Sequence, residues 1–114
     1  MNKRISLLLT SSLFLAMAGS GFAHAAVDAV QAQELMKTNK CGKCHEIAKT
    51  KTAPSLKKIA AKYKGKTDGE EKIIKNITTG PTVKDADGNE EEHYIIKTKD
   101  PAKLKNLAQW ILSQ

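Results

Sequence analysis

Cys41-Gly42-Lys43-Cys44-His45 is the stretch around which this 114-residue chain is organised. Two cysteines stand three positions apart, and a histidine follows the second one at once. This spacing lets each thiol add across one vinyl group of a single porphyrin, and it carries the imidazole to the iron on one face. C-x-x-C-H is the pattern of c-type haem attachment. We therefore expect one covalently bound haem c, with Cys41 and Cys44 as its thioether residues and His45 as the proximal iron ligand.

The cysteine pair has two other interpretations: a redox disulfide and half of a zinc site. A zinc site would need two further ligands, but the chain has no third cysteine and no histidines or carboxylates at paired spacing. A thioredoxin-like motif belongs beside a βαβ pattern, whereas the residues before Cys41 have helical periodicity and no strand-rich half follows. A plain disulfide stays open as the main alternative.

The first 25 residues have the pattern of a secretory signal peptide. Asn2-Lys3-Arg4 is the charged start, residues 5–18 are apolar, and Ala23-His24-Ala25 is an A-x-A cleavage signal. The apolar run is too short and interrupted to favour a membrane-spanning helix, and an uncleaved anchor is the alternative. We expect cleavage before Ala26 and a single periplasmic domain over residues 26–114. Covalent haem attachment suits such an extracytoplasmic compartment.

The composition limits what this domain can be. Residues 26–114 suffice for one domain with a modest core, and only 4% of the chain is aromatic. A buried porphyrin would supply the missing apolar surface, and two thioether bonds would staple the fold, so we expect a poorly folded chain without haem. The formal charge of +7 falls to +5 when Lys3 and Arg4 leave with the leader.

A basic surface of this kind favours acidic redox partners. The mature chain has no nucleic-acid motif and no arginine, so we expect no nucleic-acid binding. We also expect a monomer that does not insert into a membrane after cleavage. Lysines 57, 58, 62, 64 and 66 form a charge run that is either a solvated face or a partner-docking patch.

Four segments have helical periodicity. Residues 28–38 open with a capping-box pattern at Asp28, and a second helix starts at Ala53-Pro54, with Pro54 in its first turn, and ends by Gly65. Met36 can in principle ligate haem iron, but it lies just before the attachment site, and we interpret it as core packing.

A third helix follows the capping-box pattern Thr67-Asp68-Gly69-Glu70 and stops at Gly80-Pro81. The last helix, residues 101–113, has Asp100 as its N-cap and proline at its first position. The polar segment from residue 82 to residue 92 is predicted as a loop with a turn at Asp87-Gly88-Asn89. The pattern as a whole predicts an all-α domain.

Together these features resemble the small bacterial class I monohaem cytochromes c, over essentially the whole mature chain. The specific parts are the C-x-x-C-H motif and residues 53–63 and 107–112. The resemblance implies the class I cytochrome c fold, with about four short helices wrapped around one haem and with the first and last helices packed across each other. It also implies that Pro54, a further cofactor-site residue, offers its backbone carbonyl to the His45 imidazole.

The chain departs from this family on the distal side of the iron. Family members usually place a methionine in the loop before the last helix, and this chain has no methionine after Met36. His93 stands in that loop, 17 positions before Trp110. We predict His93 as the sixth ligand, which gives bis-histidine iron with a lowered potential. The alternative is an ordinary loop histidine beside glutamates 90–92, with the iron five-coordinate or held by Asn or Lys.

The predicted function is outer-sphere electron transfer by a periplasmic carrier. Two alternatives stay open: a small-ligand-binding or sensing haem protein with an open or displaceable distal site, and the cytochrome subunit of a larger oxidoreductase. We do not expect an enzyme, because two mature histidines do not supply the convergent acid and base groups of a catalytic site.

Overall fold

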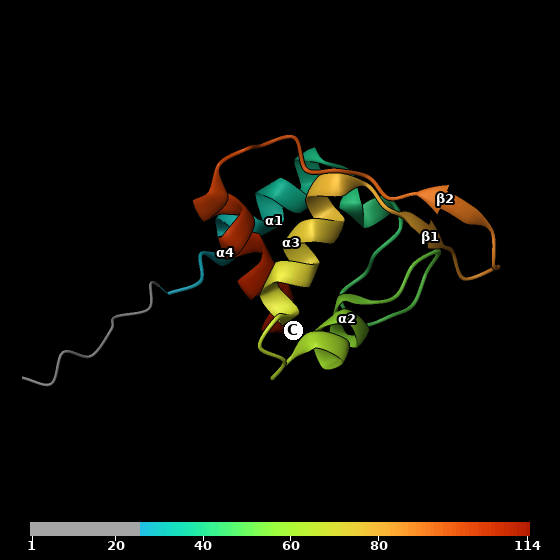
Figure 1. The fold of residues 1–114 in the computed structure, drawn as a ribbon, viewed down its shortest axis with the longest axis horizontal. Coiled ribbons are helices and arrows are strands. Elements are labelled where there is room, and N and C mark those ends of the chain that lie inside the picture. Colours follow the sequence, from blue (N-terminus) through green and yellow to red (C-terminus); the bar gives the residue numbers. More distant parts are fainter. Residues whose placement is uncertain (1–25) are drawn as a thin grey trace, which may run out of the picture.

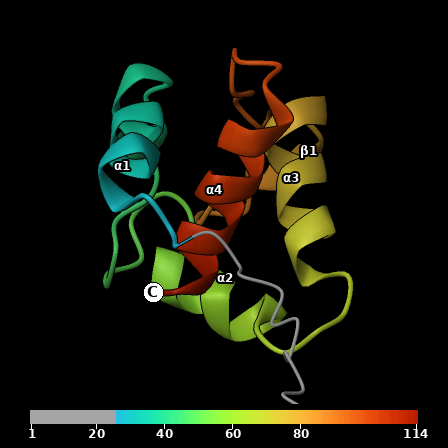
Figure 2. The ribbon, with the colours of Figure 1, turned by 90° about the vertical axis from the view of Figure 1, so that its left-hand side faces the viewer.

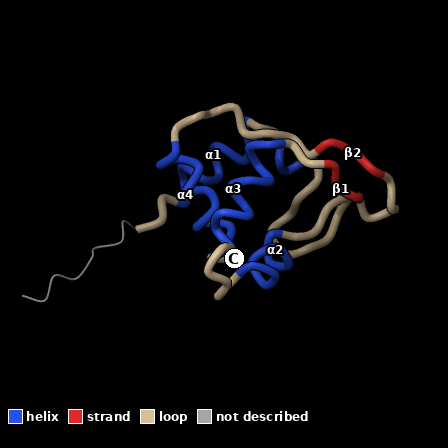
Figure 3. Tube along the Cα trace, in the orientation of Figure 1, coloured by secondary structure: helices blue, strands red, loops and turns tan. Residues whose placement is uncertain are grey.

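The computed structural model describes residues 26–114, so the expected signal peptide, residues 1–25, and its cleavage before Ala26 lie outside the described residues. The helices are α1, Ala29–Thr38; α2, Leu56–Tyr63; α3, Gly69–Thr79; and α4, Pro101–Leu112. A 3₁₀ turn, η1, covers Cys41–Lys43. Helices are the main regular structure (Figure 3), which confirms the all-α prediction. Within this described part, no helix is long and apolar enough to cross a membrane.

Helix α4 is the centre of the hydrophobic core. It contacts α1, α2 and α3, and Figure 2 shows it between α1 on one side and α3 on the other. Full burial of one large apolar side chain stabilises a fold by about 1.5–3 kcal/mol, so these contacts hold α1, α2 and α3 against α4. The buried core residues are Ala32, Leu56, Ile73, Ile77, Ile96, Leu104, Leu107, Ala108, Trp110 and Ile111.

The start of α1 is fastened to α4. Asp28 is the predicted N-cap, and its carboxylate accepts a hydrogen bond from the Gln31 backbone N–H at 2.9 Å. The return bond of a capping box comes from elsewhere, because Asn106 Oδ1 accepts from the Asp28 N–H at 2.8 Å. Asn106 Nδ2 also donates to the Asp28 carbonyl at 2.8 Å. The first and last helices are thus joined, as the family resemblance implies.

Helix α2 begins later than the sequence predicts. Ser55 is its N-cap, since the Ser55 hydroxyl accepts a hydrogen bond from the Lys58 N–H at 3.2 Å. The first helical residue is therefore Leu56, and Pro54 lies outside the helix. The correction matters for the site, because Pro54 then belongs to the loop that follows the cysteine motif.

The capping box predicted at the start of α3 does not form. Asp68 is the N-cap but makes no capping bond from its side chain. Its carboxylate instead pairs with Lys72 at 2.7 Å, and Glu70 accepts a hydrogen bond from Gln109 of α4 at 3.0 Å. Gly69 is needed here because a Cβ at this position would collide with the backbone oxygen of Tyr63.

A short antiparallel hairpin occupies the segment predicted as a loop. Strand β1, Thr82–Lys84, pairs with β2, Glu90–Glu92, and Val83 stands opposite Glu91. Three consecutive glutamates have neither the alternation nor the residue types typical of a strand, so the sequence did not indicate β2. The hairpin forms one end of the molecule (Figure 1).

Asp85 orders the turn of this hairpin. Its Oδ1 accepts hydrogen bonds from the N–H groups of Asp87 and Asn89 at 2.9 and 2.8 Å. The Asn89 side-chain amide also donates to Asp85, and these bonds lower the pKa of the Asp85 carboxyl. The neighbouring Ala86 N–H donates to the Thr52 carbonyl at 2.8 Å. The hairpin is thereby tied to the loop that follows the cysteine motif.

Candidate haem site

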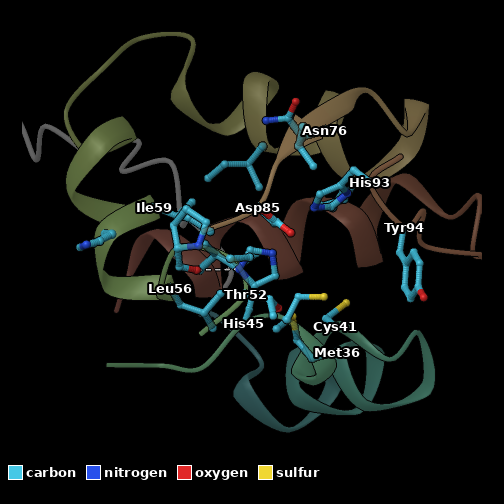
Figure 4. A pocket seen from close by; sticks show the side chains of 18 of the residues that line it. Met36, Cys41, His45, Thr52, Leu56, Ile59, Asn76, Asp85, His93 and Tyr94 are labelled. Carbon is cyan, nitrogen blue, oxygen red and sulfur yellow. Dashed lines mark hydrogen bonds between the residues drawn. The ribbon is translucent and has the colours of Figure 1, made fainter. Parts of the chain in front are cut away.

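The five site residues predicted from the sequence line one cavity of ≈ 340 Å³. They are Cys41, Cys44, His45, Pro54 and His93. Figure 4 shows His45 and Cys41 on one side of this space and His93 across from them. Apolar side chains of three helices and of the segment before α4 contribute to the wall; they are Leu56, Ile59, Ile77, Ile96, Leu107 and Ile111.

The η1 turn positions the two thiols. Lys40 precedes the turn in the left-handed conformation, with φ 60°, and the N–H groups of Cys44 and His45 both donate to the Cys41 carbonyl, at 3.2 and 3.0 Å. This tight winding brings both cysteines and the histidine to the same cavity. The two thiols are free and partly buried. Burial raises the pKa of the Cys41 thiol.

The His45 ring is held by the loop that follows it. Its Nδ1 lies 2.7 Å from the carbonyl oxygen of Pro54. A carbonyl only accepts hydrogen bonds, so Nδ1 carries the proton and Nε2 keeps a free lone pair in the neutral ring. Burial lowers the pKa of the His45 imidazole, although the Pro54 bond acts in the opposite direction. A neutral imidazole is the form that binds metal.

His93 enters the cavity from the segment that follows β2. The His93 N–H donates to the Pro81 carbonyl at 3.0 Å, and three residues later the Ile96 N–H donates to the Ile77 carbonyl at 2.7 Å. The centres of the His45 and His93 rings are 6.1 Å apart, and their planes are inclined by 50°. His93 Nδ1 is buried without a hydrogen-bond partner among residues 26–114. An orphaned buried nitrogen of this kind calls for an explanation such as an ion or a ligand.

Gly80 allows the His93 segment to approach the end of α3. It adopts φ +61°, and a Cβ placed there would lie 3.1 Å from both the His93 carbonyl oxygen and Ile95 Cγ2. The helix stop at Gly80, predicted from the sequence, therefore also sets how closely the histidine segment packs against α3.

Residues 26–114 contain no group of three or more His, Cys, Asp or Glu side chains that could hold a metal ion. The zinc reading of the cysteine pair thus finds no further ligands in this part of the chain. Met36 is partly buried and packs against the core, as predicted, and it also lines the cavity.

Sequence reasoning missed two polar side chains of the cavity wall, Asn76 of α3 and Tyr94 beside His93. For Asn76 a signal was available, because it lies three residues after the buried Ile73 on the core-facing stripe of α3.

The donor set of this cavity fits a covalently bound haem. Two thiols and one imidazole come from a single tight turn, a second imidazole has an unsatisfied buried nitrogen, and the rest of the wall is mainly apolar. These are the groups that thioether attachment and axial ligation of haem iron require.

Comparison with known proteins agrees with this chemistry. The family profile described as Cytochrome c matches residues 29–114. The cytochrome c-551 of Azotobacter vinelandii is 31% identical over 84 residues, which cover 71% of this chain and 94% of that protein.

Two solved structures share the fold. The class 1 cytochrome MtoD from Sideroxydans lithotrophicus ES-1 is 49% identical, with a TM-score of 0.73 over 77% of this chain and 97% of that one. Wild-type cytochrome c552 of Nitrosomonas europaea is 31% identical, with a TM-score of 0.55 over 71% and 96% of the two chains. The chain that contains this candidate site therefore belongs to the class I cytochrome c family, whose members are haem-binding electron-transfer proteins.

Proposed function

We propose that this cytochrome c is a bis-histidine electron carrier, with its single haem attached to Cys41 and Cys44 and its iron ligated by His45 and His93. The observation that carries the proposal is the pair of imidazoles facing each other at 6.1 Å across a cavity that both cysteines line. No other histidine lies within residues 26–114.

The ring separation suits one metal ion between the two imidazoles. A metal–nitrogen bond of about 2.0 Å, plus about 1.1 Å from the nitrogen to the ring centre, puts two ring centres on opposite sides of one ion about 6 Å apart. Rings that merely pack together span about 4.5–7 Å, so distance alone does not decide. The bare Nε2 of His45 and the orphaned nitrogen of His93 favour ligation.

When bound, the haem supplies a one-electron iron couple. The Pro54 carbonyl fixes the tautomer and the orientation of the His45 ring, and a partner of this kind raises the basicity of a ligating imidazole. The apolar part of the wall would pack against the porphyrin. His93 in place of the usual thioether ligand would lower the potential, and iron held by both His45 and His93 would have no open site for a small ligand.

We infer that the carrier works outside the cytoplasm, after cleavage before Ala26, and docks on acidic redox partners. The signal-peptide pattern of residues 1–25 supports the first inference. Lysines 57, 58, 62, 64 and 66 support the second, because all of them are exposed and Lys58 and Lys62 border the cavity. Positive charge beside the site raises the encounter rate with an acidic partner.

Carbon monoxide separates this carrier from a small-ligand haem protein. We expect the visible spectrum of the reduced wild-type protein to stay unchanged after CO is added, because His93 occupies the position that CO would take. His93→Ala should bind CO within the mixing time. Ile95→Ala is the matched control, since Ile95 is nearby but is 47% exposed, and it should behave as the wild type does. An immediate shift in the wild-type spectrum would favour the open-site alternative and contradict bis-histidine ligation.

A further inference from the structure

We propose that the cavity face of this protein binds a second copy of the same chain, through two arms of opposite charge. The basic arm is residues 56–66, which include α2, and the acidic arm is residues 82–92, the hairpin. This interface would place two haem cavities opposite each other, and only that consequence rests on the proposed function.

The two arms carry large and opposite charges. The basic arm has five lysines and no carboxylate, whereas the acidic arm has five carboxylates and one lysine, Lys84. The charges of the two arms are not paired within the chain. The ion pair found within residues 26–114 joins Asp68 to Lys72, and neither residue belongs to an arm. All five lysines of the basic arm are exposed, and so are Asp87 and the three glutamates of β2. The charges are therefore available to a partner.

Both arms border the same cavity from different sides. Lys58 and Lys62 line it from α2, and Asp85, Glu91 and Glu92 line it from the hairpin, with Lys84 and Lys40 as the other charged lining residues. Figure 1 shows α2 and the hairpin as separate projections on the side of the molecule away from the start of α1. The face around the cavity is consequently positive on one side and negative on the other.

Such a face is complementary to itself. A two-fold rotation about an axis in the plane of the face, perpendicular to the line between the arms, lays the basic arm of each copy on the acidic arm of the other. The interface is isologous and closes as a dimer, so it does not propagate into a filament. Exposed charges are screened over about 10 Å at 0.1 M salt, and we therefore expect a weak, salt-dependent complex.

The docked arrangement suits electron exchange between copies. One electron passes from a reduced copy to an oxidised copy, the first becomes oxidised as the second becomes reduced, and no other reactant is needed. Charge complementarity of this type acts mainly on the encounter rate and on orientation. The basic arm would still attract a purely acidic partner, but such a partner would leave the acidic arm without a role.

Charge reversal in the holoprotein tests the interface. Lys58→Glu/Lys62→Glu lowers the net charge of the basic arm from +5 to +1, and Glu90→Lys/Glu91→Lys changes that of the acidic arm from −4 to 0. Asp85 and Glu92, which lie beside the turn and His93, stay unchanged. Self-association is followed by the concentration dependence of backbone-amide NMR shifts at about 10 mM salt and at about 1 M salt, where the screening lengths are ~30 Å and ~3 Å.

We expect wild-type shifts at low salt that map to both arms and vanish at high salt. Either double substitution alone leaves one arm with almost no net charge and should weaken self-association by about tenfold or more. Both double substitutions together leave arms of +1 and 0 and should not restore it. A mixture of the two single-arm variants lays an unchanged acidic arm on an unchanged basic arm and should associate more tightly than either variant alone. The control Lys103→Glu/Lys105→Glu lies on exposed positions of α4, away from both arms. It changes the net charge by as much as the basic-arm variant does and should leave association unchanged.

Three outcomes would overturn this interface: wild-type shifts that do not respond to salt, a mixture that associates no better than its components, or self-association that is unchanged in Glu90→Lys/Glu91→Lys. The visible spectrum of each sample reports haem attachment and iron ligation separately. Failure of the carrier proposal is thus visible in the spectrum, whereas failure of the dimer is visible only in the shifts.

Discussion

Replacing Cys41 and Cys44 together by alanine is expected to give a chain that loses its haem to acidified organic solvent and, once stripped, has little helix. Without haem, the apolar wall of the ≈ 340 Å³ cavity faces water, and several large apolar side chains that lose their burial, at about 1.5–3 kcal/mol each, would together cost ~5–10 kcal/mol. This is comparable to the whole stability of a small domain, about 5–15 kcal/mol. Mass spectrometry after extraction should find the bare peptide, and far-ultraviolet circular dichroism should find a largely unfolded chain.

Lys43→Ala is the matched control for this experiment. Lys43 lies between the two cysteines and is exposed, so its replacement should leave the haem mass and the helix content unchanged. If the stripped double variant kept native helix content and unfolded cooperatively, the haem would not be part of the core, and this account of the fold would be wrong.

Replacing His93 by methionine is expected to raise the midpoint potential by on the order of 0.1 V, a fraction of the roughly 0.8 V range that axial ligands span. The thioether sulfur is a poorer donor to ferric iron than imidazole is, so the oxidised state loses stability relative to the reduced state. Spectroelectrochemical titration of wild type and variant, under the same conditions, measures the shift.

Ile95→Met controls for the addition of a methionine near the site. Ile95 is 47% exposed and does not line the cavity, so its replacement should leave the potential where it is in the wild type. Equal potentials for wild type and His93→Met would mean that residue 93 does not reach the iron.

Local sequence patterns predicted where α1 and α4 begin, because the capping bonds at their N-termini join near neighbours in the sequence. The Asp100 carboxylate accepts from the Ala102 N–H at 2.9 Å, and Asp28 does the same for Gln31 at 2.9 Å. Both bonds connect residues two or three positions apart. A pattern of residue types at fixed spacing is enough to indicate such contacts.

Contacts between segments that are distant in the sequence could not be predicted from such local patterns. Asn106 replaces half of the capping box at Asp28, across 78 positions of sequence, and Glu70 bonds to Gln109 of α4 instead of closing its own box. The hairpin was missed because Glu90–Glu92 has no strand-like pattern, and its pairing with β1 depends on a turn that Asp85 organises. At the starts of α1 and α3, residues of α4 therefore replaced the expected local partners.

The site was more predictable than the hairpin. Cys41, Cys44 and His45 are adjacent in sequence, so their common placement follows from one motif. The carbonyl of Pro54 was expected to approach His45 only through the family resemblance, and the structure contains that contact at 2.7 Å. The opposition of His93 and His45 could be proposed from a missing methionine, but the 6.1 Å separation of the rings needed the fold.

The absorption and near-infrared spectrum of the purified ferric holoprotein tests the central claim most directly, because it reports which atoms hold the iron from each side. Two imidazole ligands predict six-coordinate low-spin iron without a methionine-to-iron charge-transfer band, and a change to high spin in His93→Ala. A high-spin ferric wild-type protein, or identical spectra for wild type and His93→Ala, would contradict the claim that His45 and His93 share the iron.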